Sequence, residues 1–264
     1  MAMFPKDLVM TGRLLEGRTV VLCGAARARG MGLATARLFH QHGAKLVLLD
    51  VDQAELDAAT STFPGRSALG LRIDVTDISS CQHAIAQALD WDLGAGRMDA
   101  VINFAGITQK RSFMEIEQAD FDLVCSINLK GAFNLSQAVI GPLREQRSGS
   151  LVHISSLGAQ QGGLYGGAHY CASKAGILGM IRTLAVELGK DNVRVNAIAP
   201  GLVITDFSRS GRTDEEKQAS AAGWPLQRAG SVEEMAGACL FLASDLSTYV
   251  TGATLDVNGG AYLR

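Results

Sequence analysis

The stretch that decides the fold is Ser150-Leu-Val-His-Ile-Ser-Ser-Leu-Gly-Ala-Gln-Gln-Gly-Gly-Leu-Tyr-Gly-Gly-Ala-His-Tyr-Cys-Ala-Ser-Lys174. Its first six residues form an apolar run typical of a strand, and a glycine-rich segment follows. Over residues 172–188 the apolar side chains recur at helical spacing. The sequence therefore predicts a strand, a glycine loop and a helix in that order.

The polar residues of this stretch suit proton transfer. If the helix begins near His169, Tyr170 and Lys174 stand four residues apart on one face, with the ammonium beside the phenol. Bringing a tyrosine pKa from about 10 to near neutrality takes roughly 4 kcal/mol. One cation about 4 Å away, at an effective dielectric near 20, supplies that amount, and an oxidised nicotinamide would add to it. Tyr170 is predicted to exchange a proton with an alcohol as hydride leaves its carbon, while Ser156 orients the reacting oxygen.

The same spacing has a plainer interpretation. A Tyr-x-x-x-Lys pair is common on helices, where the lysine stem packs along a surface tyrosine. The functional interpretation of Tyr170 and Lys174 therefore depends on what the rest of the chain contains.

A phosphate-binding turn is indicated near the N-terminus. Residues 19–24 have the pattern of a short buried strand, and residues 33–42 that of an amphipathic helix. Glycines between them let backbone N–H groups approach a pyrophosphate, and the helix N-terminus favours its negative charge. The residues expected to contact a dinucleotide here are Gly24, Arg29, Gly30, Met31 and Gly32.

The next strand, residues 44–50, ends in Asp50, about twenty residues past the glycine turn. A carboxylate at this point accepts both hydroxyls of the adenosine ribose and repels a 2′-phosphate, which favours NAD over NADP. Arg27 and Arg29 argue the other way, because cations in the turn can pair with that phosphate. Asp50 has the greater weight, since Val51 and not a basic residue follows it.

The remaining chain alternates between strand and helix patterns. Strands are predicted at 67–74, 99–106, 193–199 and 253–257, and helices at 78–89, 121–146 and 232–243. Residues 206–223 read as a mobile segment over the pocket. This alternation predicts an α/β fold with a doubly wound parallel sheet covered by helices on both faces. A terminal arm over residues 1–17 and a single domain over 18–264 are expected.

Composition excludes several classes of protein. The chain has 264 residues, is 47% hydrophobic and carries a net charge of -2, so a nucleic-acid surface is not expected. There is neither an apolar run long enough to span a membrane nor a signal-peptide pattern, and a cytoplasmic protein is expected. The five cysteines are widely spaced, and neither disulfides nor a metal site are predicted. Cys171, His153 and His169 are interpreted as structural.

Several motifs in this order resemble the short-chain dehydrogenase/reductase family, over nearly the whole chain after Arg13. The dinucleotide turn corresponds to Gly24, Gly30 and Gly32, although Cys23 replaces the usual threonine and the first two glycines are two residues further apart than is common. Other matching motifs are Asp74-Val75, Asn103-Phe-Ala-Gly106, Asn128-Leu-Lys-Gly131, Pro200-Gly-Leu-Val-Ile-Thr205 and Val257-Asn-Gly-Gly260. The resemblance implies a single-domain, Rossmann-like fold.

The resemblance also implies roles for these residues. Asn128, Ser156, Tyr170 and Lys174 correspond to the family's catalytic tetrad, with Ser155 as an alternative for the serine. Tyr170 and Lys174 would also contact the cofactor, Lys174 at the nicotinamide ribose, and Asn128 would hold a water that links Lys174 to solvent. The remaining cofactor contacts implied are Asp74 and Val75 at the adenine, Asn103, Ala105 and Gly106, and Pro200, Gly201, Val203 and Thr205 at the nicotinamide.

Three functions remain open from the sequence. The first is an NAD-dependent dehydrogenase of a secondary alcohol, possible substrates being a polyol or a sugar, for which the polar segment 206–223 gives weak support. The second is an NADPH-dependent reductase of 3-oxoacyl thioesters, supported by Arg27 and Arg29. The third is a dinucleotide sensor without activity, which the intact catalytic residues argue against. The family further implies a homo-oligomer, commonly a tetramer, in which Phe133, Ile177 and Ile181 face either a partner or the core.

Overall fold

The computed structural model describes residues 12–163, 166–207 and 213–263 of the protein. Seven strands, all parallel, form one sheet in the order β3-β2-β1-β4-β5-β6-β7. The strands are β1 Thr19–Cys23, β2 Lys45–Asp50, β3 Ala68–Arg72, β4 Ala100–Asn103, β5 Gly149–Ile154, β6 Val193–Pro200 and β7 Thr254–Val257. This topology confirms the predicted fold class, because parallel neighbours require crossover helices between them.

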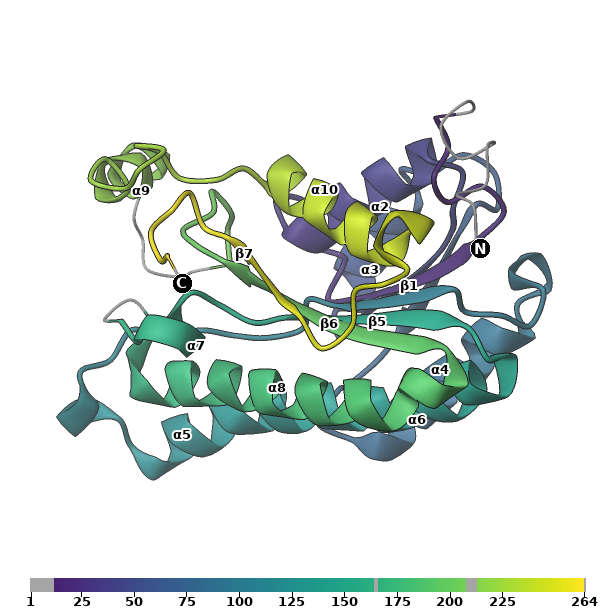
Figure 1. Cartoon of the computed structure of the whole chain (residues 1–264), viewed down its shortest axis with the longest axis horizontal. Helices are drawn as coiled ribbons and strands as arrows, with labels where there is room; N and C mark the ends of the chain where they lie inside the picture. Colours follow the sequence, from purple (N-terminus) through teal and green to yellow (C-terminus); the bar gives the residue numbers. More distant parts are fainter. Residues whose placement is uncertain (1–11, 164–165, 208–212, 264) are drawn as a thin grey trace.

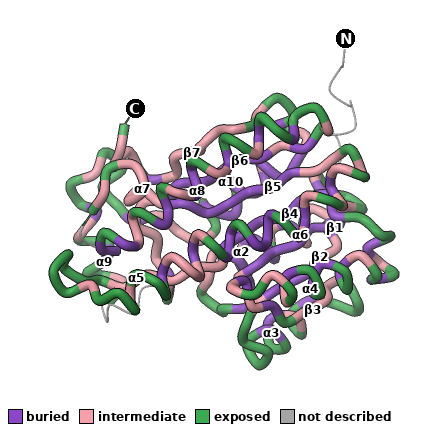
Figure 2. The backbone as a smooth tube through the Cα atoms, turned by 90° about the horizontal axis from the view of Figure 1, so that it is seen from below, coloured by how far each residue is buried: buried purple, intermediate pink, exposed green. Residues whose placement is uncertain are grey.

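Helices cover both faces of the sheet (Figure 1). The helices on one face are α2 Met31–Gln41, α3 Gln53–Thr60 and α10 Val232–Ala243, and those on the other are α4 Ile78–Asp90, α6 Gly131–Gln146 and α8 Gly167–Leu188. Three shorter helices, α5 Gln118–Cys125, α7 Gly158–Gln161 and α9 Asp214–Ser220, lie near one end of the molecule (Figures 1 and 2).

Alternating strand residues divide between two hydrophobic cores. In β1, Val20 and Leu22 pack with α2 and α10, whereas Val21 and Cys23 pack with α4 and α6. Figure 2 shows the central strands buried along their length. Burial on both faces explains why the strands are continuous apolar runs and lack the polar alternation of a half-exposed sheet.

The strand order reverses between β1 and β4, which pair with each other although residues 24–99 separate them in the chain. In doubly wound sheets the crevice outside the carboxyl ends of such neighbouring strands is where ligands bind. The glycine turn after β1 and the segment after β4 meet there. Gly24, with φ at +76°, lies so close to Ala105 that a Cβ atom would come within 2.6 Å of the Ala105 nitrogen.

The long helix predicted over 121–146 is interrupted. α5 ends at Cys125, a π-helical turn spans Ser126–Lys130, and α6 starts at Gly131. A π turn accommodates an extra residue per turn and is often found at functional sites. Here it turns Asn128 inward, where the residue is fully buried. Hydrophobic periodicity did not reveal the extra residue, because the flanking apolar pattern continues on both sides.

Other elements also differ from the prediction. α3, between β2 and β3, was not expected, although Asp52 caps it by accepting from the N–H groups of Ala54 and Glu55. The segment 206–223, interpreted as mobile, contains helix α9, which Thr213 begins in a capping box with Glu216. The polar residues Ser208, Arg209, Ser210 and Arg212 lie outside the described residues.

The part of the N-terminal segment that the structure describes packs on the domain. Leu15 is buried, and its N–H donates to the carbonyl of His42. Residues 1–11 lie outside the described part.

Three residues were predicted to face either a partner subunit or the core. Ile177 and Ile181 belong to the core, whereas Phe133 is 48% exposed.

Candidate active site

The catalytic stretch lies where β5 leads through α7 into α8. α8 begins at Gly167, so Tyr170 stands in its first turn and Lys174 one turn further. The ring of Tyr170 packs directly on Gly166, where any Cβ atom would overlap it. Lys174 Nζ lies 5.9 Å from the centroid of the Tyr170 ring. The prediction that both side chains share one face of the helix is confirmed.

The structure distinguishes the two candidate serines. Ser156 forms a side-chain hydrogen bond with Tyr170, and its Oγ also accepts from the N–H of Gly158 at 3.0 Å. Ser155 is buried and donates its hydroxyl to the carbonyl of Lys174 at 2.9 Å. Because the Ser155 hydroxyl is engaged by the helix backbone, Ser156 is the serine placed to contact an oxygen held beside Tyr170.

The expected lowering of the Tyr170 pKa is wrong for the protein by itself. Loss of solvent around the phenol raises its pKa to about 12, and the hydrogen bond with Ser156 offsets only part of that rise. Lys174 is buried too, and its ammonium donates to the carbonyl of Ile154 at 2.8 Å. Desolvation is therefore the main cause of the pKa shift at both groups, an effect that spacing along a helix does not reveal.

Burial lowers the pKa of Lys174 from 10.5 to about 8. Below that value the folded and unfolded chains both hold the proton, so the full cost of burying the charge is present near pH 7. Between about 8 and 10.5 only the unfolded chain holds it, and the free energy of unfolding rises with pH. We expect Lys174→Met to raise the free energy of unfolding near pH 7 by roughly 1–3 kcal/mol, while removing activity. Urea denaturation measures the change.

The control for that variant is Lys190→Met, because Lys190 is exposed at the far end of α8. It should leave both the free energy of unfolding and its pH dependence as they are. A Lys174→Met protein less stable than the parent near pH 7 would show that the buried ammonium contributes more through its contact with Ile154 than its desolvation costs.

Asn128 joins three parts of the site. Its Oδ1 accepts from the N–H of Ile107 at 2.8 Å, and its Nδ2 donates to the carbonyl of Ile107 and to Ser173 Oγ, both at 3.0 Å. The side chain thus fixes the segment after β4 against α8. These contacts use both Nδ2 protons, so a water held by this side chain would donate to the remaining lone pair of Oδ1.

The glycine turn fits a phosphate group. Gly30 precedes α2 and provides no side chain to accept from the first N–H groups of that helix. Free N–H groups at a helix N-terminus attract anions. Asp50 holds the other side of the turn, because its carboxylate accepts from the N–H of Ala26 at 3.1 Å and of Val51 at 2.8 Å.

The side chain of Arg29, a residue predicted to contact the cofactor, is turned toward two carboxylates. Its guanidinium forms ion pairs with Asp206, at 3.3 Å, and with Asp214 at the start of α9. Lys217 of α9 is buried and donates to the carbonyl of Thr205 at 2.9 Å and to Asp214 at 3.3 Å. These contacts tie α9 to the glycine turn and to the end of the segment after β6. Nothing in the sequence motifs indicated Lys217.

The remaining predicted cofactor residues also meet at the strand ends. Asn103 accepts from the N–H of Ala105 at 3.1 Å, and Gly106 lies against Asn128 and Lys174. Asp74 accepts from Thr76, whose hydroxyl and N–H lower the pKa of that carboxyl. The carbonyl of Val75 accepts from Asn134 at 2.9 Å.

A cavity of about 630 Å³ connects these parts. Ser156, Tyr170 and Lys174 line it, and so do Met31 of the glycine turn and the residues Pro200, Gly201, Val203 and Thr205 after β6. Met31 of the dinucleotide turn, the predicted nicotinamide segment and three of the predicted catalytic residues therefore share one space at the switch point of the sheet, whereas Asn128 is buried and does not line it.

The two histidines are structural, as expected. His153 is fully buried between Asn103 and Ser136, and burial lowers its pKa to about 3. His169 contacts Gln109 at 3.3 Å, and burial lowers its pKa as well. Neither histidine lines the large cavity.

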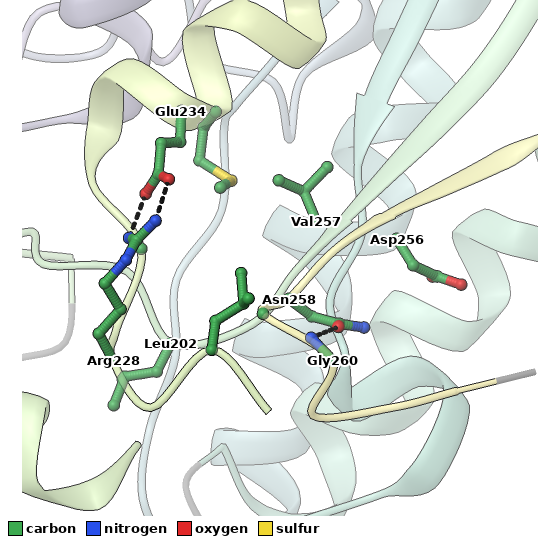
Figure 3. Close-up of a pocket in the computed structure, with 11 residues that line it drawn as sticks. Leu202, Arg228, Glu234, Asp256, Val257, Asn258 and Gly260 are labelled. Atoms are coloured by element: carbon green, nitrogen blue, oxygen red, sulfur yellow. Dashed lines mark hydrogen bonds and ion pairs between the residues drawn. The ribbon is translucent and has the colours of Figure 1, made fainter. Parts of the chain in front are cut away.

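A second cavity, of about 280 Å³, lies beside β7 and contains none of the predicted catalytic residues. Figure 3 shows its edge, where Arg228 and Glu234 form a double hydrogen bond at 2.8 and 2.6 Å. Asn258 accepts from the N–H of Gly260 at 2.9 Å on the opposite side (Figure 3). Its polar groups are paired with one another, so the larger cavity is the candidate active site.

Within the residues that the structure describes, no group of three or more His, Cys, Asp or Glu side chains is arranged to hold a metal ion. Of the helices that these residues form, none is both long and apolar enough to cross a bilayer.

A doubly wound parallel sheet with this site at its switch point defines a class, the dinucleotide-binding α/β enzymes. A family model described as enoyl-(acyl carrier protein) reductase matches residues 24–262. A solved structure titled short chain dehydrogenase/reductase family protein superposes with a TM-score of 0.83 at 35% identity, over 94% of this chain and 99% of that one.

Several relatives align with this chain over nearly the whole length of both sequences. An uncharacterized short-chain type dehydrogenase/reductase, y4mP of Sinorhizobium fredii, is 43% identical over 95% of this chain and 100% of its own. The 3-oxoacyl-[acyl-carrier-protein] reductase FabG of Thermotoga maritima is 37% identical over 93% and 98%. The L-rhamnose 1-dehydrogenase (NAD(P)(+)) of a Sphingomonas species is 34% identical over 96% and 99%. The chain belongs to the short-chain dehydrogenase/reductase family, whose members are oxidoreductases that use a nicotinamide cofactor.

Proposed function

We propose that the protein transfers hydride between NAD(H) and a secondary alcohol or ketone, with Asn128, Ser156, Tyr170 and Lys174 as its catalytic residues. The observation that carries this proposal is the meeting of Ser156, Tyr170 and Lys174 in one cavity with the glycine-turn residue Met31. A phenol and a serine hydroxyl on one wall suit the oxygen of a carbinol, and the same cavity reaches the phosphate-binding end.

The residues divide the chemistry between them. Ser156 would donate a hydrogen bond to the reacting oxygen, and Tyr170 would take its proton in oxidation or return it in reduction. Bound NAD supplies the hydride acceptor and a positive ring. Because burial raises the pKa of free Tyr170 to about 12, alcohol oxidation should rise with pH, since the deprotonated phenol is its base. Ketone reduction uses the protonated phenol, so its rate should stay level while the pH is well below that pKa and fall only as the pH approaches it.

Asp50 supports NAD as the cofactor. Its carboxylate is anchored at the glycine turn by Ala26 and Val51, where it would meet the adenosine ribose. Arg29, the cation of the turn, is engaged by Asp206 and Asp214. A carboxylate held at this point disfavours a 2′-phosphate.

The alternative is an NADPH-dependent reductase of 3-oxoacyl thioesters. Arg27 supports it, because this arginine is exposed and forms no ion pair with any described residue. The relatives named 3-oxoacyl-[acyl-carrier-protein] reductase, 36–37% identical, support it as well. The relative that acts on L-rhamnose supports a sugar or polyol for the first proposal.

A substrate panel with both cofactors tests these proposals. Secondary alcohols, polyols, sugars and a 3-oxoacyl thioester would each be assayed with NAD(H) and NADP(H), read by the absorbance of the reduced nicotinamide. We expect faster turnover with NAD(H) on an alcohol or ketone. Faster turnover of the thioester with NADPH would establish the alternative, and absence of turnover with every compound would refute both.

The finer expectations on assembly and location also remain proposals. We propose a homo-oligomer, in the form of a tetramer, that uses the faces of α5, α6 and α8. Phe121, Leu123 and Phe133 support it, because these large apolar side chains are 43%, 46% and 48% exposed on α5 and α6. A cytoplasmic location is proposed as well.

A further inference from the structure

The catalytic cavity has an unbalanced charge. Three lysines, Lys110, Lys174 and Lys217, line it, but no aspartate or glutamate does so among the described residues. Lys174 is buried against the carbonyl of Ile154, and Lys217 is paired with Asp214. Lys110 differs from both, because it is exposed and has neither an ion pair nor a hydrogen bond with any residue that the structure describes. The protein as a whole is slightly negative, at -2, so this positive charge is local.

The segment that carries Lys110 runs along the first two turns of α8. Ile107 is bound by Asn128, which also contacts Ser173 of α8. Further along, Gln109 contacts His169 at 3.3 Å. The carbonyl of Arg111 lies next to Gly167, the first residue of the helix, where an added Cβ atom would come within 3.2 Å of the Arg111 oxygen. The segment therefore passes the level of Tyr170 and continues toward the start of α8.

Contacts on both sides hold the backbone of Lys110 in place. Gln109 is fixed by His169, and the side chain of Arg111 is turned to Asp120, with Nε 3.4 Å from the carboxylate. Of two consecutive cations, one is thus neutralised by α5 and the other lines the cavity. Lys110, which has no ion pair with any described residue, can therefore contact a molecule bound beside Tyr170.

Lys110 is also poorly placed for the phosphates of a dinucleotide. Those groups are expected at the N-terminus of α2, next to Gly30 and Met31. The segment after β4 leaves the glycine turn at Ala105 and reaches Lys110 only after passing Lys174 and Tyr170. A charge at Lys110 therefore acts on the substrate side of the reacting carbon.

We propose that the substrate is an anionic alcohol or ketone, and that Lys110 binds its carboxylate or phosphate group while Ser156 and Tyr170 hold the reacting oxygen. This inference rests on the proposed function, since it places the anion relative to the carbon on which Tyr170 acts. An ammonium without a counter-ion inside a cavity that lacks carboxylates attracts an anion from solvent and selects against a neutral analogue.

Matched pairs of probes test this specificity. 3-Hydroxybutanoate against its methyl ester tests a carboxylate, and glycerol 3-phosphate against glycerol tests a phosphate. The value of kcat/KM would be measured for each compound with the parent protein, Lys110→Gln, Lys110→Arg and the exposed control Lys190→Gln. We expect one anionic member to exceed its neutral partner. In Lys110→Gln that advantage should fall about 10-fold, chiefly through KM, as for the loss of one charge-assisted hydrogen bond.

The other variants separate a binding role from a structural one. Lys110→Arg should restore most of the advantage, and Lys190→Gln should leave it whole. A preference for the neutral member in both pairs, or an anion preference that survives in Lys110→Gln, would overturn the inference. A third outcome would also overturn the inference: neither pair reacts, but the wider panel contains a neutral alcohol that does. The proposed function would stand in that case. Absence of turnover throughout the panel refutes the proposed function itself.

Discussion

Tyr170→Phe should lower kcat by about 10²–10⁴-fold, the range found when a general acid–base is removed. The substitution deletes one oxygen and keeps the ring that packs on Gly166, so the cavity and the first turn of α8 should persist. Binding of NADH, followed by its fluorescence, should therefore change little. Loss of turnover with largely intact cofactor binding is the expected combination, because proton transfer depends on the phenol whereas Lys174 and the glycine turn would still hold the dinucleotide.

Tyr249→Phe is the matched control for this substitution. Tyr249 is fully exposed and remote from the large cavity, so removing its hydroxyl should not alter kcat. Unchanged turnover in Tyr170→Phe would remove Tyr170 from the proton transfer. If the residual alcohol oxidation by Tyr170→Phe still rises with pH as in the parent protein, a group other than Tyr170 causes that pH dependence.

Asp50→Ser should shift the ratio of kcat/KM for NAD to that for NADP toward NADP by about 10- to 100-fold. A 2′-phosphate about 4 Å from a carboxylate, at an effective dielectric near 20, is repelled by up to roughly 4 kcal/mol per unit charge. Partial exposure of Asp50 reduces this value, which is why the smaller range is expected. The hydroxyl of serine can still accept from Ala26, so the glycine turn should keep its shape.

Asp57→Ser tests whether any lost carboxylate has this effect. Asp57 lies on the exposed side of α3, where it contacts Gln53, and its removal changes the net charge equally. The cofactor ratio should not move in this variant. An Asp50→Ser protein with the parent ratio would contradict the NAD proposal and give Arg27 the greater weight.

Much of the site was predictable because the chemistry is local in the chain. Tyr170 and Lys174 share a helix face whenever residues 167–188 are helical, and Ser156 follows the strand that precedes them. The predicted glycine turn lies where β1 meets α2, and Asp50 lies at the end of β2. Strand ends and helix starts fix these positions before any tertiary contact forms.

Other features depend on which elements become neighbours. The contacts of Asn128 with Ile107 and Ser173 and the pairing of Arg29 with Asp206 and Asp214 join segments that the chain separates widely. Lys217 reaches the carbonyl of Thr205 from the helix that follows it. Their partners are chosen by packing, so neither spacing nor periodicity indicates them.

The sequence by itself determined the parallel α/β architecture, the positions of the motifs along it and the residue types available for proton transfer, because hydrophobic period and glycine placement act over short stretches of chain. Only the tertiary structure decided the electrostatics. Burial of Tyr170 and Lys174 moves the pKa of the phenol upward and that of the ammonium downward. Folding also places Lys110 on the wall of a cavity that no carboxylate among the described residues lines. Solvent exclusion and the distances between charges are properties of the assembled fold, and for that reason they appear only when the elements are packed.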